Sequence, residues 1–435
     1  MKEYSYPHFS LPGADREIRR ICEEKLRSLY GASIPWVAED RLKKELYMLK
    51  ASSKSSVYLL LRLLSENLEK AGGYINTRGT MGSTLVAFLL GISDANPLPA
   101  HYRCSKCSHT EFAEAISGYD LAPKACPHCG VLMHGDGHNI PYEVETGLIP
   151  TPQQTTVEIN VAASVWEQAV AFLVELLGED RVACAGEWNN PVCFMLLPEG
   201  MRFEDITPLV PLEPPFGGVG QKTVLPGYRL EHTLLRLILL PNYDYDRIYK
   251  LRQLTSTRTE AIHYNDPLLC RCVQKETNLG LTNSEEKLTR QILGMLNNVH
   301  FSDLVRASGI SHGTGAWQVN AEALIKEHPF SSLIGDRDDV LLTLQKYGVD
   351  RETAYAVMTE VRKGRFSQSH PLSQELEIVP RWYLESLFKI QYLFCKSHIV
   401  HYMKTALSLA WFRHYFPEQF FRVSRQHSEE TTVNP

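Results

Sequence analysis

The sequence Cys104-Ser105-Lys106-Cys107, followed after eighteen residues by Cys126-Pro127-His128-Cys129, forms two Cys-x-x-Cys knuckles. Two knuckles at this separation are typical of a zinc site with four thiolate ligands. Each knuckle is a tight turn that directs two sulfur atoms to one point. Four unrelated thiols or two disulfides are the alternatives. Because four thiolates leave no coordination position for a water, we expect a structural Zn²⁺ bound by Cys104, Cys107, Cys126 and Cys129.

The size and composition of the chain indicate a globular protein with two or three domains. The chain has 435 residues, of which 44% are hydrophobic and 22% are charged. Its net charge of −5 gives no overall basicity, so contact with nucleic acid would require a local patch. The N-terminus has no secretory pattern, and no apolar run reaches the ~18 residues of a membrane span. These features predict a cytoplasmic protein that does not contact a membrane.

The apolar periodicity predicts helices first, then strands, then helices again. The first helix is expected to begin after Asp15 as its N-cap. The predicted helices before the cysteines cover residues 15–30, 39–50 and 55–70, and the predicted strands after them cover residues 155–161, 181–185, 192–197 and 228–240. The helical pattern that begins near residue 244 includes segments at 380–394 and 398–415, and residues 424–435 are expected to fray.

A glycine-rich turn follows the third predicted helix, in Thr77-Arg78-Gly79-Thr80-Met81-Gly82-Ser83-Thr84. Glycines allow backbone N–H groups to approach a phosphate, and the helix that begins at Leu85 offers its N-terminus to an anion. Arg78 can add a forked donor. The same pattern also occurs in ordinary turns, so both interpretations stay open.

Four groups of motifs resemble the polymerase core of PolC, the Gram-positive-type DNA polymerase III alpha subunit of the C family. The first group is the glycine-rich turn with residues 96–102, and the second is the cysteine module with residues 118–121 and 136–141. The third group is residues 301–314 with 335–339. The fourth is residues 361–364 with 380–383 and 394–398. The resemblance covers the palm and fingers core. The family's PHP and exonuclease modules, and its DNA- and clamp-binding modules, have no counterpart in these 435 residues.

The resemblance implies an α+β fold. Its elements would be a nucleotidyltransferase-type mixed β palm, an inserted four-cysteine zinc module and a large helical fingers-like region. The implied divisions are the N-terminal helical part of the palm at 1–100, the zinc module at 101–140, the palm sheet at 141–243, the fingers-like region at 244–423 and a disordered tail at 424–435.

The residues at the family's reaction centre differ in this chain. The family transfers nucleotides with two divalent ions that are bound by an Asp-x-Asp pair and by a third Asp on a later strand. The resemblance puts these positions at Thr156, Glu158 and Ile238. Only Glu158 is a carboxylate, so we expect poor Mg²⁺ binding and a catalytically degenerate protein. The family also has several tens of residues more between Gly186 and Pro191.

Other residues implied by the resemblance could still bind DNA or nucleotide. The set that matches the family's nucleotide region and fingers motif is Arg78, Gly79, Gly82, Ser83, Lys396 and His398. A basic cluster of Arg362, Lys363 and Arg365 could contact a DNA backbone, or could be a solvated helix end.

Three functions therefore remain open. The first is a polymerase-like protein that does not polymerise and that binds DNA, nucleotide or a replication protein. The second is an active DNA polymerase whose metal site uses Glu158 with Asp244, Asp246 or Glu231. The third is an assembly factor that has no contact with nucleic acid.

Overall fold

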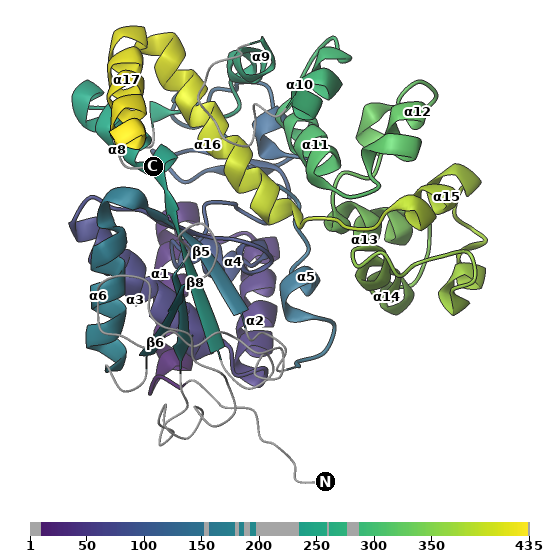
Figure 1. Ribbon diagram of the computed structural model, residues 1–435, viewed down its shortest axis with the longest axis horizontal. Helices are drawn as coiled ribbons and strands as arrows, with labels where there is room; N and C mark the ends of the chain where they lie inside the picture. Colours follow the sequence, from purple (N-terminus) through teal and green to yellow (C-terminus); the bar gives the residue numbers. More distant parts are fainter. Residues whose placement is uncertain are drawn as a thin grey trace.

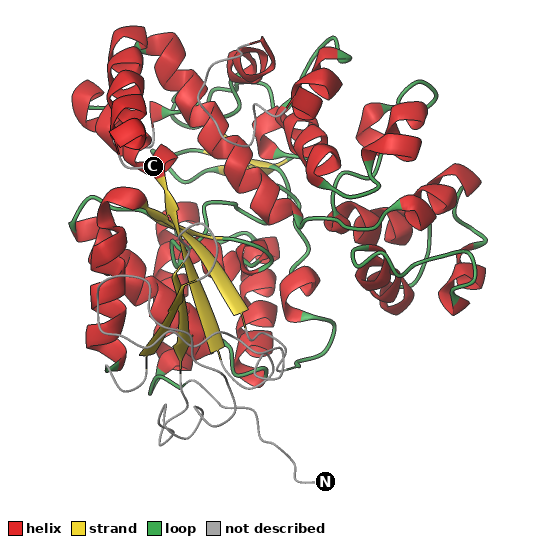
Figure 2. Ribbon diagram, in the orientation of Figure 1, coloured by secondary structure: helices red, strands yellow, loops and turns green. Residues whose placement is uncertain are grey.

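The computed structural model of the protein describes residues 10–151, 156–178, 182–186, 192–196, 235–258, 261–275 and 287–433. Helices dominate the described part of the chain, and its strands form one larger and one smaller sheet (Figure 2). An α+β fold is thereby confirmed.

The N-terminal part is helical, as the periodicity predicts. Its helices are α1 (Ala14–Tyr30), α2 (Trp36–Ala51), α3 (Ser55–Lys70) and α4 (Leu85–Leu89), with a 3-10 turn, η1 (Met81–Ser83), before α4. Asp15 is not the N-cap of the first helix. The N-cap is Gly13, whose φ of 77° is left-handed, and Asp15 lies in the first turn, where a carboxylate stabilises the helix dipole.

A mixed five-stranded sheet has the order β1-β5-β8-β7-β6. Its strands are β1 (Ile75–Thr77), β5 (Thr156–Ala162), β6 (Val182–Gly186), β7 (Val192–Leu196) and β8 (Leu235–Asn242). Strands β5 and β8 run parallel to each other, and the other neighbours are antiparallel. The short turn η3 (Ala163–Val165) and helix α6 (Trp166–Leu177) follow β5. In β5 the burial alternates over residues 156–159, as in a sheet with one covered face, and residues 160–162 are all buried.

The two faces of this sheet differ in character. Val157, Ile159 and Leu239 lie in a core shared with α1, α3 and α6. Because side chains alternate along a strand, Thr156 and Glu158 point to the opposite face. Figure 1 shows the helices gathered around the β5–β8 pair. Burial of the apolar face therefore determines which residues of β5 are left for function.

The cysteine module has a small sheet of its own, in the order β3-β2-β4. Its elements are β2 (His101–Arg103), β3 (Thr110–Phe112), η2 (Gly118–Asp120) and β4 (His134–Asp136), followed by the short helix α5 (Glu143–Thr146). Its core is small and consists mainly of Met133 and the cysteines Cys104 and Cys126. A module with so little apolar burial benefits from a metal or another cross-link.

The rest of the chain is helical and has a second, separate core. Its elements are α8 (Tyr243–Thr255), α9 (Pro267–Lys275), α10 (Lys287–Gly294), α11 (Phe301–His312), η7 (Trp317–Ala321), α12 (Glu322–Leu324), η8 (Phe330–Ser332), α13 (Arg337–Lys346), α14 (Arg351–Val361), η9 (Pro371–Leu376), α15 (Arg381–Lys389), α16 (Lys396–Tyr415) and α17 (Pro417–Val433).

Two expectations for this part need correction. The helix predicted at 380–394 ends at Lys389, because Tyr392 leaves it to form a β-bridge with Thr314. The tail expected to fray from residue 424 is helical as far as Val433, because α17 packs against α16 and α8.

Helix α16 connects the two parts of the molecule. It runs along the boundary between the sheet and the helical part (Figure 1). His401 of α16 lies 2.7 Å from the amide nitrogen of Asn76 on β1, and the hydroxyl of Tyr245 on α8 contacts the other ring nitrogen. Lys404 donates to the backbone carbonyl of Asp94 at 3.0 Å. None of the described helices has the length and apolar composition needed to cross a membrane.

Candidate functional site

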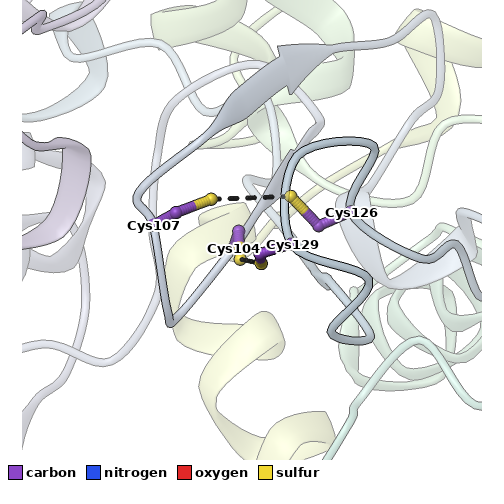
Figure 3. A group of neighbouring side chains, drawn as sticks. All are labelled: Cys104, Cys107, Cys126 and Cys129. Carbon is purple, nitrogen blue, oxygen red and sulfur yellow. Dashed lines mark hydrogen bonds between the residues drawn. The ribbon is translucent and has the colours of Figure 1, made fainter.

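The four predicted cysteine ligands converge on one point (Figure 3). Their sulfur atoms all lie within 4.8 Å of one another. Cys104 Sγ is 3.4 Å from Cys129 Sγ, and Cys107 Sγ is 3.5 Å from Cys126 Sγ. Tetrahedral zinc with bonds of ~2.3 Å keeps its sulfurs roughly 3.8 Å apart. The four residues therefore fit a metal ion of this type, and each knuckle supplies one sulfur to each close pair.

The backbone of the first knuckle favours the thiolate form of Cys104, whereas the pKa values of Cys107 and Cys129 are raised with neighbouring thiols among the causes. The N–H of Cys104 donates to His109 O at 2.9 Å, and the N–H of Cys126 donates to Val131 O at 2.8 Å in the same way. Burial acts to raise the pKa of Cys104, but backbone N–H groups of Cys107 and Lys106 outweigh it and lower that pKa to about 6. A thiolate is the form that binds a metal.

The three positions that the resemblance assigns to the reaction centre lie on one face of the sheet. Glu158 on β5 and Ile238 on β8 are direct register partners, and Thr156 is two residues before Glu158 on the same strand. Side chains at such positions share a face. The fold thus brings together Glu158 and Ile238, which are 80 positions apart in the chain.

Only one of these three side chains can offer a carboxylate oxygen. Glu158 is half-exposed, and its Oε2 lies 3.6 Å from Arg78 Nε. The backbone N–H of Arg78 also donates to the carbonyl of Glu158 at 2.8 Å. The surviving carboxylate therefore has a cation as its neighbour.

The glycine-rich turn and the first turn of α16 lie against each other. Ser83 Oγ is 3.0 Å from Ser397 Oγ, and Ser397 Oγ donates to Gly79 O at 3.0 Å. The N–H of Gly79 points to Nδ1 of His398 at 3.4 Å. Gly79 has a left-handed φ of 68°, and a Cβ at Gly82 would lie 3.1 Å from Ser93 Oγ. The left-handed backbone favours glycine at position 79, and a side chain at position 82 would require Ser93 to shift slightly.

Buried charges hold the turn from behind, and the sequence analysis did not single them out. Glu145 accepts from Thr80 Oγ1 at 2.6 Å and pairs with Lys54 Nζ at 3.0 Å. Arg41 donates to Ser83 O at 3.1 Å and forms an ion pair with the buried Glu45. The Arg41–Glu45 pair has the i, i+4 spacing of one helix and was visible in the sequence. Lys54 and Glu145 are 91 residues apart, so no local pattern could connect them.

Basic side chains gather at the start of α16. Lys396 is 6% exposed, and Arg337, at the start of α13, is 8% exposed. The N–H of Arg337 donates to Phe394 O at 3.0 Å. Burial lowers the pKa of Arg362, and the neighbouring Arg337 lowers it further. Burial also lowers the pKa of His398 well below its ordinary value, with Arg78 as the next cause.

Arg337 is therefore a site residue that the sequence analysis did not select. It lies in the motif at 335–339, which supported the resemblance, so that motif was the available signal. Of the predicted basic cluster, Arg362 is half-buried and has its pKa lowered by the charge of Arg337, whereas Lys363 is exposed and Arg365 pairs with Glu360 at 2.6 Å. The cluster is thus divided between the start of α16 and the outer surface.

The carboxylates considered for a rearranged metal site are held elsewhere. Asp246 accepts from Ser164 Oγ at 2.6 Å, beyond the far end of β5, and Asp244 pairs with Arg247 at 2.9 Å. Ala162, at the end of β5, lies four residues after Glu158, and this distance along the strand is roughly 13 Å. Two catalytic ions lie only ~4 Å apart. Glu231 lies outside the described residues.

Two family profiles match this chain. The profile described as the bacterial DNA polymerase III alpha NTPase domain matches residues 16–186, and the profile described as the bacterial DNA polymerase III alpha subunit finger domain matches residues 245–377. The chain therefore belongs to the bacterial DNA polymerase III alpha family.

Curated relatives narrow the resemblance to one type. DNA polymerase III PolC-type of Latilactobacillus sakei is 31% identical over 94% of this chain and 32% of the relative. The PolC-type protein of Bacillus subtilis is 29% identical over 93% of the chain and 32% of the relative, and that of Thermotoga maritima is 30% identical over 94% and 35%. The chain is a divergent PolC-like homologue, as predicted, and it spans about a third of the length of these relatives.

Proposed function

We propose that this protein is a catalytically degenerate PolC-like palm and fingers protein that binds DNA or nucleotide in DNA replication, in the cytoplasm. The single observation that carries the proposal is the register of β5 and β8. It aligns Glu158 with Ile238 and leaves Thr156 as the third position on that face. A parallel strand pair with its reaction-centre positions on one face supports a nucleotidyltransferase-type palm in residues 141–243.

The residues at this face do not fit a pair of Mg²⁺ ions. Magnesium requires oxygen ligands in near-octahedral geometry, usually from carboxylates and phosphates. Ile238 has no ligand atom, Thr156 has no charge, and Glu158 already faces Arg78. We therefore derive no step of nucleotidyl transfer for this chain.

The zinc module is proposed as a brace for the neighbouring palm. Four thiolates leave no open position on Zn²⁺, so the metal would fix the fold of residues 101–140 and would not activate water. Asn96 supports this role, because it donates to Asp136 of β4 at 3.0 Å and so connects the module to the first helical part.

DNA is the proposed macromolecular ligand. Lys363 is exposed at the end of α14, and Arg362 stands beside it. Contacts from such residues to phosphates give an affinity that falls with salt and does not depend on sequence. The fingers-like region at 244–423 would then contact the backbone of a primer-template.

Primer extension is the experiment that tests degeneracy. We expect the purified protein to give no template-dependent extension with Mg²⁺ or Mn²⁺. Extension that disappears in Glu158→Ala would instead establish an active polymerase with a rearranged site. The separation of Asp246 from the Glu158 face argues against that second function.

DNA binding is tested separately, by fluorescence anisotropy on a labelled primer-template. We expect binding that weakens steeply between low and physiological salt and that is lost in Arg362→Ala/Lys363→Ala. Arg381→Ala is the matched control, since Arg381 is an exposed cation paired with Glu385. Equal loss in the control, or no binding at low salt, would favour an assembly factor without nucleic-acid contact.

A further inference from the structure

The cysteine module contacts two different parts of the chain. On one side, Asn96 donates to the hydroxyl of Tyr30 on α1 at 3.2 Å and to Asp136 of β4 at 3.0 Å. The same hydroxyl lies 3.1 Å from Nε2 of His101 on β2. These contacts attach the module to the N-terminal helices. Its other side meets the helical part that begins at α8.

Tyr119 of η2 reaches into the core of that helical part. Its ring stacks on Tyr264 with the centroids 5.1 Å apart, and it meets the edge of Phe301 at 4.8 Å. The side chain of Tyr119 is 6% exposed and belongs to the same core as the apolar residues of α11 and α16. A buried aromatic ring contributes a large apolar area, so this contact is the main attachment on this side.

Two hydrogen bonds flank the ring of Tyr119. Asp120 Oδ1 accepts the backbone N–H of Ser302 at 3.0 Å, in the first turn of α11, where a carboxylate also suits the helix dipole. Asn265 donates from Nδ2 to Leu121 O at 3.3 Å. Three successive residues of the module therefore hold two separate segments of the helical part.

The cysteines act on these contacts through the chain. The turn η2 lies within residues 108–125, between the two knuckles, so a metal bound by both knuckles closes this segment into a loop. Loop closure removes conformational freedom that the segment would otherwise lose when it docks. The N–H of Gly118 donates to Gly137 O at 2.6 Å, which holds η2 against the end of β4. His134 of β4 in turn stacks on His263, with ring centroids 4.2 Å apart.

We infer that the cysteine module is a metal-dependent joint, in which zinc binding is thermodynamically linked to the docking of Tyr119 and Asp120 on the helical part. The inference rests on the proposed zinc site and adds a second attachment to the proposed brace for the palm. Linkage is reciprocal, so a substitution that breaks the docking contact must weaken zinc binding although it changes none of the four ligands. Loss of zinc must likewise loosen the docking contact.

Competition with a chromogenic chelator measures the zinc affinity of the full chain under reducing conditions. Asp120→Ala removes the acceptor of the Ser302 N–H and should weaken zinc binding by about five- to twentyfold, within the usual range of coupling between two sites. Asp120→Asn keeps an acceptor and should recover most of that loss. Glu114→Ala is the matched control, because it removes an exposed carboxylate from the same loop, and it should change the affinity less than about twofold.

A variant on the helical side separates linkage from local damage to the module. Asn265→Ala leaves every residue of the module unchanged, and it should still weaken zinc binding about two- to fivefold. Zinc removal from the wild-type protein should speed amide exchange in the peptide that contains Ser302, while the later turns of α11 stay protected. Added zinc should reverse this change.

The possible results separate the joint from the zinc site itself. Absence of zinc from the wild-type protein would overturn both. Zinc binding that is unchanged in Asp120→Ala and in Asn265→Ala would overturn the joint alone and leave the module as a local brace. Equal losses in Asp120→Ala and Glu114→Ala would assign the effect to negative charge near the metal, and the joint would again be wrong.

Discussion

The Lys54–Glu145 pair offers a sharp test of how the glycine-rich turn is held. Lys54 Nζ lies 3.0 Å from Glu145 Oε1, with side-chain exposures of only 10% and 1%. The other carboxylate oxygen accepts from Thr80 Oγ1 at 2.6 Å. Changing Glu145→Gln keeps the shape and an acceptor for Thr80, and removes only the charge. Lys54 would then be a buried ammonium group without a counter-charge.

The expected loss of stability is about 3 kcal/mol. Removal of one partner from a buried pair costs roughly 3–5 kcal/mol. The lower end applies here because Lys54 Nζ also donates to the backbone carbonyl of Glu145 at 3.0 Å, and that bond survives the substitution. In Lys54→Met/Glu145→Gln the unpaired charge is gone, so the double variant should recover at least half of the loss.

Urea unfolding followed by tryptophan fluorescence measures these differences. The exposed pair Arg381–Glu385 is the control, and Glu385→Gln should cost less than about 0.5 kcal/mol. Nucleotide affinity of folded Glu145→Gln should stay within about threefold, since Thr80 keeps its acceptor. The reasoning fails if Glu145→Gln costs less than 1 kcal/mol, or if the double variant is as unstable as the single one.

Three further predictions concern the metal module, pH and the reaction centre. Elemental analysis should find about one zinc per chain. Because the module has little apolar core of its own, Cys126→Ser should raise the rate of amide hydrogen exchange in residues 101–136 while the helical cores stay protected. Loss of protection throughout the protein would contradict this expectation. Burial lowers the pKa of His138 to about 3, so on acidification the unfolded chain takes up a proton at this histidine before the folded chain does. The contribution of His138 to the free energy of unfolding should therefore be complete above pH 6.5. It should fall by up to ~1.4 kcal/mol per pH unit as the pH drops toward 3. Unfolding of His138→Gln should show a shallower slope, and an unchanged slope would assign the effect to other groups. The double variant Thr156→Asp/Ile238→Asp should bind Mn²⁺ at least tenfold more tightly, as measured by electron paramagnetic resonance. The reason is that the register of β5 and β8 puts both new carboxylates beside Glu158. No gain in affinity would mean that the three positions do not share one face.

The spacing of the cysteines was sufficient to predict a common ligand site. Knuckle geometry is local, since four residues form each turn. The helices of the first hundred residues were also predictable, because their apolar periodicity matches the burial that forms them. Where local signals compete with packing, as at Asp15 and at the end of α15, the observed helix boundaries differ from the predicted ones.

Sequence alone could name Thr156, Glu158 and Ile238 only through a resemblance, since no local pattern connects two strands 80 residues apart. The tertiary structure decided that they share a face, because hydrogen bonding between β5 and β8 fixes their register. The tertiary structure also decided which residues lie beside each charged side chain. The position of Arg78 beside Glu158 depends on the antiparallel pairing of β1 with β5. The contact of Asp338 with the backbone N–H of Lys396 depends on how α13 and α16 meet. Composition fixes how many charges a chain has, but only packing determines which of them are left to bind a ligand.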